Sequence, residues 1–198
     1  MVEHVVVYRG ICLSEAIEVV GSQKYLAAEE RKFWNDIEIK AVFGSGVYLV
    51  SDYTVAAEYA YCHAEANHDK GSVIRQLLYL QNPLQLDGRF GEKEIRSLAL
   101  AWKYPHGIPD EEAVEIASVG LSRWAGSRIQ EYVTQLGHDG IVYHIDDTLT
   151  YYIAYKPDEQ ISAVQLDFVY DIKDIQSATF TDLRNQYQAH MKEMPFQE

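Results

Sequence analysis

The stretch Phe43–His63, FGSGVYLVSDYTVAAEYAYCH, decides the fold, because it joins a turn, a strand and a helix in close succession. Gly44 and Gly46 allow a tight turn and a close approach of the backbone to a ligand. Val47–Val50 has the β-branched and aromatic residues typical of a strand. The Ser51-Asp52 pair that follows can cap a helix over the rest of the stretch.

Two tyrosines lie on either side of the junction between this strand and this helix. Tyr48 lies on the strand, and Tyr59 follows eleven residues later, about a turn and a half into the helix. This placement allows their rings to face each other across a slot that accepts a flat, polarisable ligand. The alternative is that both are packing residues, as most of the fifteen tyrosines must be.

The composition indicates one acidic domain. The chain has 198 residues, enough to bury a sizeable core without metals or disulfides. Its formal net charge of -13 argues against binding of nucleic-acid backbones as the main function, although a local basic patch stays compatible with it. Cys12 and Cys62 have no zinc-ligand spacing and favour a reducing, cytosolic environment, while a single disulfide between them stays open.

Membrane and export signals are missing from the sequence pattern. No apolar run reaches the roughly 18 residues that a membrane helix requires. The first residues lack the charged and then apolar pattern of a signal peptide. We therefore expect a cytoplasmic protein, or one delivered into a target cell without a classical signal peptide, with no membrane partner.

The distribution of strand and helix signals predicts an α+β fold. Strands at both ends enclose helices, without regular alternation of the two. Residues 1–198 then form one domain, in which about 91–136 is a helical insertion and about 182–198 a polar C-terminal tail. The expected strands are 4–8, 47–50, 73–80, 140–144, 151–155 and 163–169, and the expected helices are 14–20, 27–34, 54–63, 92–102, 109–119 and 123–136.

Three separated blocks resemble one enzyme superfamily. They are Tyr8-Arg9-Gly10, the Gly46-Val47-Tyr48 strand with Tyr59, and LGHDGIVY at 136–143 followed by YYIAYKPDEQI at 151–161. Together they resemble the ADP-ribosyltransferases: the second block is similar to the diphtheria-toxin and poly(ADP-ribose) polymerase branch, and the third to phage and bacterial effector domains. The resemblance covers roughly 4–166 and implies split antiparallel β-sheets with flanking helices.

The resemblance also implies NAD as co-substrate and a role for each matched residue. The backbone of Gly10 would hold the nicotinamide amide, and the rings of Tyr48 and Tyr59 would enclose the nicotinamide. Arg9 would reach the ribose or the pyrophosphate, since a guanidinium binds phosphate oxygens in bidentate fashion. The implied cofactor-binding residues are Tyr8, Arg9, Gly10, Gly46, Tyr48 and Tyr59.

The chain departs from the family pattern at two important positions. Arg9 stands where this branch carries a histidine, and Tyr151 aligns with the catalytic glutamate that holds a ribose hydroxyl and stabilises developing positive charge. Asp147 in the preceding turn and Glu159 after the strand are candidate substitutes, although aspartates in turns more often cap the turn. The implied catalytic residues are Arg9, Tyr48, Tyr151, Asp147 and Glu159.

The resemblance implies transfer of a single ADP-ribose unit from NAD to a macromolecular acceptor, expected to be a protein, by a bacterial or phage effector or toxin. An alternative is a catalytically inactive module of the same fold that binds a nucleotide or a partner protein, since the glutamate is missing. A third is an α+β interaction protein whose tyrosines only pack. No metal is expected, because His138 and His144 around Asp139 have no third ligand.

Overall fold

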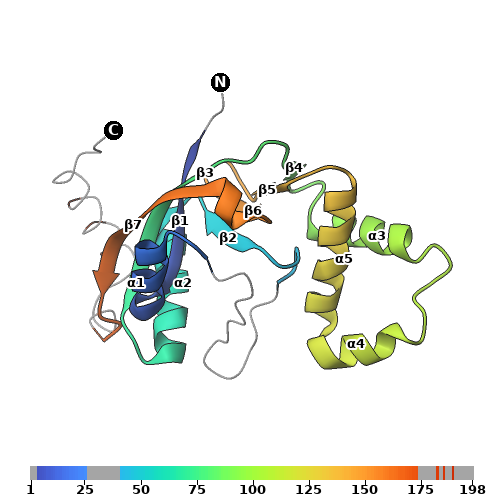
Figure 1. The fold of residues 1–198 in the computed structure, drawn as a ribbon, viewed down its shortest axis with the longest axis horizontal. Helices are drawn as coiled ribbons and strands as arrows, with labels where there is room; N and C mark the ends of the chain where they lie inside the picture. Colours follow the sequence, from blue (N-terminus) through green and yellow to red (C-terminus); the bar gives the residue numbers. More distant parts are fainter. Residues whose placement is uncertain (1–3, 26–40, 174–181, 183–184, 186–188, 190–198) are drawn as a thin grey trace.

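The computed structural model describes residues 4–25 and 41–173 together with the single positions 182, 185 and 189. Helices and strands alternate irregularly along the chain (Figure 1). The strands are β1 (Val5–Cys12), β2 (Val47–Val50), β3 (Gly71–Leu78), β4 (Leu84–Leu86), β5 (Gly140–His144), β6 (Thr150–Ala154) and β7 (Ile161–Tyr170). The helices are α1 (Leu13–Ser22), α2 (Tyr53–Asn67), α3 (Glu92–Lys103), α4 (Glu112–Val119), α5 (Leu121–Gln135) and α6 (Pro157–Gln160).

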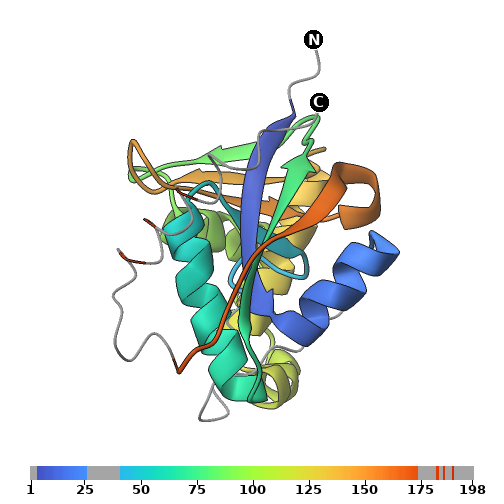
Figure 2. The same ribbon diagram turned by 90° about the vertical axis from the view of Figure 1, so that its left-hand side faces the viewer.

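The strands form a sheet in the order β4-β5-β6-β2-β1-β3-β7. Neighbouring strands are antiparallel except β4 and β5, which are parallel. Figure 2 shows α1 and α2 on opposite sides of β1, and Figure 1 shows α3, α4 and α5 grouped at one end of the molecule. The α+β class predicted from the sequence is confirmed.

The sheet is almost divided between β1 and β2. β1 pairs with β3 over its whole length, from Val5 to Cys12, but with β2 only at the pair Tyr8–Val50. From Arg9 onward, the edge of β1 that faces β2 therefore has no strand partner among the described residues. This near-division into β4-β5-β6-β2 and β1-β3-β7 is the split arrangement that the resemblance implies.

Side-chain alternation along β2 shows how helices cover the two faces of the sheet. Val47 and Leu49 lie in a buried cluster with Ala16 of α1, so α1 covers that face. Val50 lies in a second cluster with Ala56 of α2, on the opposite face. A third cluster places α3 and α5 on the same face as α2, over β5 and β6.

Most predicted elements are present, with shifted ends. The strands at 47–50 and 140–144 have the predicted bounds, and Asp52 caps α2 by accepting a hydrogen bond from the amide of Val55 at 3.0 Å. β4 was not predicted, because three residues carry too little periodicity to show a strand. The helix expected at 27–34 and nearly all of the tail at 182–198 lie outside the described residues.

The three helices α3, α4 and α5 connect β4 to its parallel neighbour β5. Arg128 of α5 joins α4 through hydrogen bonds to Glu112 at 3.1 Å and Glu115 at 2.7 Å, and it also donates at 2.9 Å to Tyr104, directly after α3. The indole of Trp124 also donates to Glu112, at 2.7 Å. The helical signals between 91 and 136 thus correspond to one packed unit at the end of the sheet.

Candidate functional site

Tyr48 is fixed by the turn that precedes it. Its hydroxyl donates to the carbonyl of Gly44 at 2.8 Å and accepts from the amide of Phe43 at 3.1 Å. Burial raises the pKa of Tyr48, so the hydroxyl stays protonated and can donate at physiological pH. The ring packs in the cluster formed by α3, α5 and the β5–β6 side of the sheet.

Glycines allow this turn to form and to lie against its neighbours. Gly44 has a φ of +91°, in the left-handed region that favours glycine. A Cβ atom at Gly46 would lie 2.9 Å from the carbonyl oxygen of Ala154 on β6. A glycine is therefore required at position 46 for β2 to pack beside β6. The contact of Gly46 with a ligand stays a prediction.

Tyr59 and Tyr151 meet through their hydroxyls, which lie 3.3 Å apart. Tyr59 projects from α2 and is 39% exposed. Tyr151 lies on β6 opposite Val50, two residues from the position opposite Tyr48, so Tyr48 and Tyr151 are diagonal neighbours on one face. Tyr48, Tyr59 and Tyr151, here called the tyrosine face, thus come from three elements and lie on the same side of the sheet.

Tyr48 and Tyr59, which were predicted to enclose the nicotinamide, both lie near Tyr151, but their hydroxyls bind different partners. The hydroxyl of Tyr48 is bound to the Gly44 carbonyl, whereas that of Tyr59 is bound to Tyr151. The structure shows no ring contact between Tyr48 and Tyr59 in the part of the chain that it describes. The slot that encloses a ligand between the two rings remains a prediction.

Tyr8 and Gly10 lie on this face as well. Tyr8 is paired with Val50, which is in turn paired with Tyr151, so the three form a row across β1, β2 and β6. Gly10 lies directly beneath α2, where a Cβ atom would be 1.7 Å from the carbonyl oxygen of Ala56. The absence of a side chain at Gly10 is therefore required for α2 to pack on β1.

Arg9 does not converge with the tyrosine face as predicted. Its guanidinium lies over the ring of Tyr25 at 4.7 Å and 3.6 Å from the carboxylate of Glu15, on the side covered by α1. Strand alternation is the reason, because Arg9 lies between Tyr8 and Gly10 and must point to the opposite face. Arg9 is only 6% exposed and lies on the other side of the sheet, so in this arrangement it does not reach a ligand on the tyrosine face.

Neither candidate for the missing acid contacts Tyr151. Asp147 is exposed in the turn between β5 and β6, and the neighbouring Asp146 caps that turn by accepting from the amides of Thr148 at 2.7 Å and Leu149 at 2.9 Å. Glu159 lies on α6, beyond the other end of β6 from Tyr151, and is 73% exposed beside Lys156. The distance along β6 removes Glu159 from the tyrosine face.

Sequence reasoning did not consider Glu58, whose negative charge is the smallest of the causes that raise the pKa of Tyr151. Burial is the main cause that raises the pKa of Tyr151, followed by the hydrogen bond with Tyr59 and then by the charge of Glu58. The position of Glu58 directly before Tyr59 on α2 was the available signal. Glu58 is exposed, so its carboxylate faces solvent near the rim of the tyrosine face.

No protein-family model and no curated protein matches the sequence. Among solved structures, a chain in the crystal structure of the M. tuberculosis MbcT-MbcA toxin-antitoxin complex is similar, with a TM-score of 0.41 and 13% sequence identity. The similarity covers 93% of this chain and 91% of that chain. A likeness at this level assigns no activity and no partner to the protein.

The aspartate and histidine of the third sequence block have a structural role. The carboxylate of Asp139 accepts hydrogen bonds from the amides of Gln81 at 2.7 Å and Asn82 at 3.0 Å, and its carbonyl accepts from Gln160 at 2.8 Å. His138 contacts the carbonyl of Asn82 at 3.0 Å. The described residues contain no cluster of side chains that could hold a metal ion.

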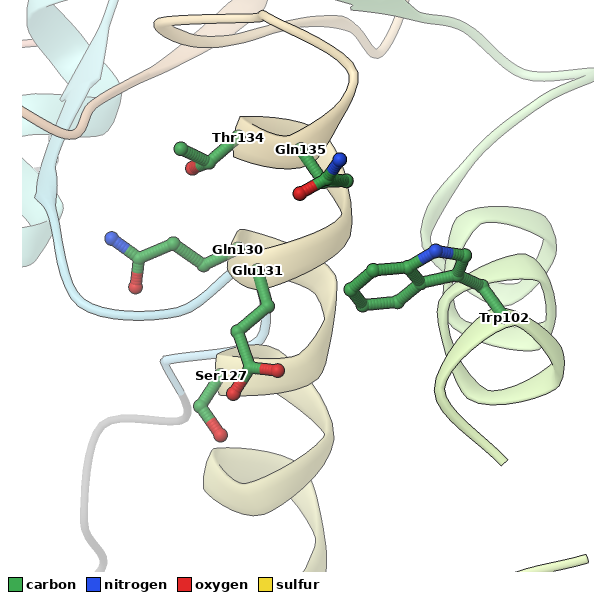
Figure 3. A pocket seen from close by; sticks show the side chains of 6 residues that line it. All are labelled: Trp102, Ser127, Gln130, Glu131, Thr134 and Gln135. Carbon is green, nitrogen blue, oxygen red and sulfur yellow. The ribbon is translucent and has the colours of Figure 1, made fainter. Parts of the chain in front are cut away.

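A groove of about 570 Å³ lies on α5, outside the tyrosine face (Figure 3). Trp102 of α3 forms one wall, and Gln130 extends from α5 on the other side. The remaining lining residues belong to α5 and are Ser127, Glu131, Thr134 and Gln135.

Across residues 4–25 and 41–173, no helix is both long and apolar enough to span a membrane.

Proposed function

We propose that the protein is an NAD-dependent mono-ADP-ribosyltransferase that modifies a macromolecular target, expected to be a protein, as an effector or toxin. The observation that supports this most strongly is the early parting of β1 from β2. β1 leaves β2 after a single residue pair, Tyr8–Val50, and Gly10 lies on the stretch that follows. In the part of the chain that the structure describes, an open edge of β1 therefore lies next to the tyrosine face.

Such an edge suits the amide of nicotinamide. On an unpaired edge every second residue presents a backbone N–H and C=O, and a carboxamide needs one acceptor and one donor. In the proposal, the backbone of Gly10 makes these two hydrogen bonds, and the half-exposed ring of Tyr59 stacks on the nicotinamide. No contact is assigned to Arg9, which lies on the other face with Glu15 and Tyr25.

The proposed reaction breaks the bond between the nicotinamide nitrogen and the ribose carbon. Nicotinamide leaves as a neutral molecule, and a nucleophile of the acceptor forms the new bond to the ribose carbon and loses its proton. Tyr151 stays neutral, because burial raises its pKa, so it can orient a ribose hydroxyl but adds no negative charge. The resemblance ties chain elongation to the glutamate, and we therefore expect single transfer.

A catalytically inactive binding module is the second candidate, and the same residue favours it. Tyr151 cannot stabilise positive charge as a carboxylate would, and Asp147 and Glu159 are both exposed without contacting it. The tyrosine face would then bind a nucleotide or a partner protein without cleaving anything. Where the ligand is NAD, the two candidates predict the same contacts and differ only in turnover.

The proposed function is tested with NAD labelled in its adenylate part. The protein is incubated with the label and a cell extract, and we expect both nicotinamide release and a labelled macromolecule. Tyr59→Ala should weaken NAD binding about tenfold or more, because it removes a stacking ring. Tyr61→Ala is the matched control. Tyr61 lies on the same helix, but it contributes to the raised pKa of Tyr170 on β7 and not to that of Tyr151.

The outcomes separate the two candidates. NAD binding without turnover, together with gain of NAD hydrolysis in Tyr151→Glu, would establish the binding module. Absence of NAD binding in the parent protein would overturn the transferase and leave only a module that binds another nucleotide or a partner protein.

A further inference from the structure

Gln130 makes an unusual contact with the turn that carries Tyr48. Its side-chain carbonyl accepts from the amide of Ser45 at 2.8 Å, and its side-chain amide donates to the carbonyl of Ser45, also at 2.8 Å. The amide of Gln130 thus binds one residue of the turn twice, as a strand partner would. Figure 3 shows Gln130 extending from α5 on the side away from Trp102.

Two glycines bring α5 close enough for this contact. A Cβ atom at Gly126 would lie 2.0 Å from the carbonyl oxygen of Ala41 and 2.9 Å from the amide nitrogen of Gly44. A Cβ atom at Gly44 would lie 2.6 Å from the Cβ of Gln130. The turn therefore packs directly on α5, with its position set by sterics at Gly126 and by hydrogen bonds at Gln130.

The same turn determines where the Tyr48 ring lies. Gly44, next to Ser45, accepts the hydrogen bond of the Tyr48 hydroxyl at 2.8 Å. Phe43 binds that hydroxyl through its amide at 3.1 Å, and its carbonyl accepts from Tyr155 at 2.8 Å. A continuous chain of contacts thus runs from Gln130 through Ser45 and Gly44 to the ring of Tyr48.

We infer that Gln130 is a positioning residue for the candidate NAD site, because it fixes the glycine turn and through it the direction of the Tyr48 ring. The inference rests on the proposed function. Gln130 touches neither Tyr59 nor Gly10 and acts only through Ser45 and Gly44. It also places a requirement for NAD binding on α5, which belongs to the helical insertion predicted at about 91–136.

The test compares variants of two glutamines on α5. Gln130→Leu keeps the size of the side chain and removes both hydrogen bonds, whereas Gln130→Glu keeps the acceptor for the Ser45 amide and removes the donor. Gln135→Leu is the matched control, since Gln135 lines the same groove and makes no hydrogen bond recorded in the described structure. Three quantities are measured: the exchange rate of the Ser45 amide without ligand, the dissociation constant for NAD, and the midpoint of unfolding in urea.

We expect Gln130→Leu to speed exchange of the Ser45 amide and to weaken NAD binding, each about tenfold, the equivalent of one lost hydrogen bond. Gln130→Glu should show smaller changes in both, and Gln135→Leu should match the parent. Because Gln130 is only partly buried and its two hydrogen bonds are exposed to water, the unfolding midpoint should change little in all three.

Each contrary result has its own meaning. Faster Ser45 exchange with unchanged NAD affinity in Gln130→Leu overturns the inference and leaves the proposed function standing. Unchanged Ser45 exchange also overturns it, because the turn is then held without Gln130. A parent protein that binds no NAD defeats the proposed function and with it the inference, and the Ser45 exchange rates still report the contact itself.

Discussion

α2 and α5 cover the same face of the sheet, but they meet the candidate site in different ways. α2 packs on β1 through small side chains, with Ala56 and Ala60 fully buried against Gly10. α5 reaches the turn before Tyr48 through the side-chain amide of Gln130. One side of the site is thus fixed by backbone sterics and the other by individual hydrogen bonds.

This difference indicates how the two sides respond to mutation. Close packing without side chains leaves no room for relaxation, so changes at the α2 side should affect the stability of the whole domain. Hydrogen bonds at the surface contribute little to global stability, so changes at the α5 side should alter local geometry and leave the fold intact. Four predictions test this contrast.

The largest effect is expected for Gly10→Ala. The new Cβ atom would lie 1.7 Å from the carbonyl oxygen of Ala56 and 2.5 Å from the amide nitrogen of Ala60, so α2 and β1 must separate. We expect a loss of about 3 kcal/mol or more in the free energy of unfolding, measured in urea. In the control Gly21→Ala on α1, nothing lies within 4 Å of the new atom, and a gain of up to about 1 kcal/mol is expected. A parental midpoint for Gly10→Ala would remove the steric argument.

The next effect is a pH dependence at His63, which is buried on α2. Burial, followed by the charge of Arg9, lowers the pKa of His63 from 6.5 to about 4. Between these two values the unfolded chain binds a proton that the folded protein does not, so stability present above pH 6.5 is lost as the pH falls towards 4. The loss should reach about 3 kcal/mol.

Urea unfolding of the parent and of His63→Gln at neutral pH and near pH 4.5 checks this prediction. Other titrating groups affect both proteins, so the parent should lose more stability than the variant on acidification. Equal losses in the two proteins would show that His63 is not buried in its neutral form.

A smaller, local effect is expected for Arg128→Met, which removes the group that binds Glu112 and Glu115 of α4 and Glu131 of its own helix α5. Arg128 is 11% exposed, but Glu115 is 45% exposed and screened by water, so we expect a loss of about 1–2 kcal/mol. Amide exchange should accelerate in α4 and not in α2. Arg89→Met in the loop after β4 is the control and should change stability by less than about 0.5 kcal/mol. Equal acceleration in α2 would contradict the separation of the two sides.

Tyr59→Phe should have the smallest effect. It removes one exposed hydroxyl contact of 3.3 Å with Tyr151 and keeps the ring. We expect a change in unfolding free energy of less than about 0.5 kcal/mol, because exposed hydroxyls exchange one partner for water. NAD affinity, measured by titration, should stay within about threefold of the parent, unlike that of Tyr59→Ala. A tenfold loss would assign the binding to the hydroxyl rather than to stacking.

The fold was largely accessible from the sequence, because its local signals agree with the elements that form. The cap at Asp52, the strand at Val47–Val50 and the face shared by Tyr48 and Tyr59 follow from short-range spacing. Strand alternation indicates that Arg9 points away from the side of Tyr8 and Gly10, but the sequence does not show which of these two sides carries the site. β1 is buried on both faces from Arg9 onward, so its apolar pattern shows no inside and outside from which the side of a given residue could be read.

The supports of the site were not accessible for a different reason. Gln130 and Ser45 are 85 positions apart, and nothing in either local sequence indicates that they meet. The contact depends on how the unit α3–α5 docks on the sheet, which is set by the burial of side chains from many elements. Close packing at Gly126 was equally hidden, because a glycine within a helical pattern shows only reduced helix propensity.

The single pair Tyr8–Val50 also has a consequence for how the molecule opens. With one rung joining them, β1-β3-β7 and β4-β5-β6-β2 can each lose their ladders without breaking those of the other, and native-state hydrogen exchange should show two cooperative units with separate opening free energies. A ligand seated on the open edge of β1 and touching Tyr48 would supply the rungs that are missing. Binding would then couple the two units, and their amides would open together.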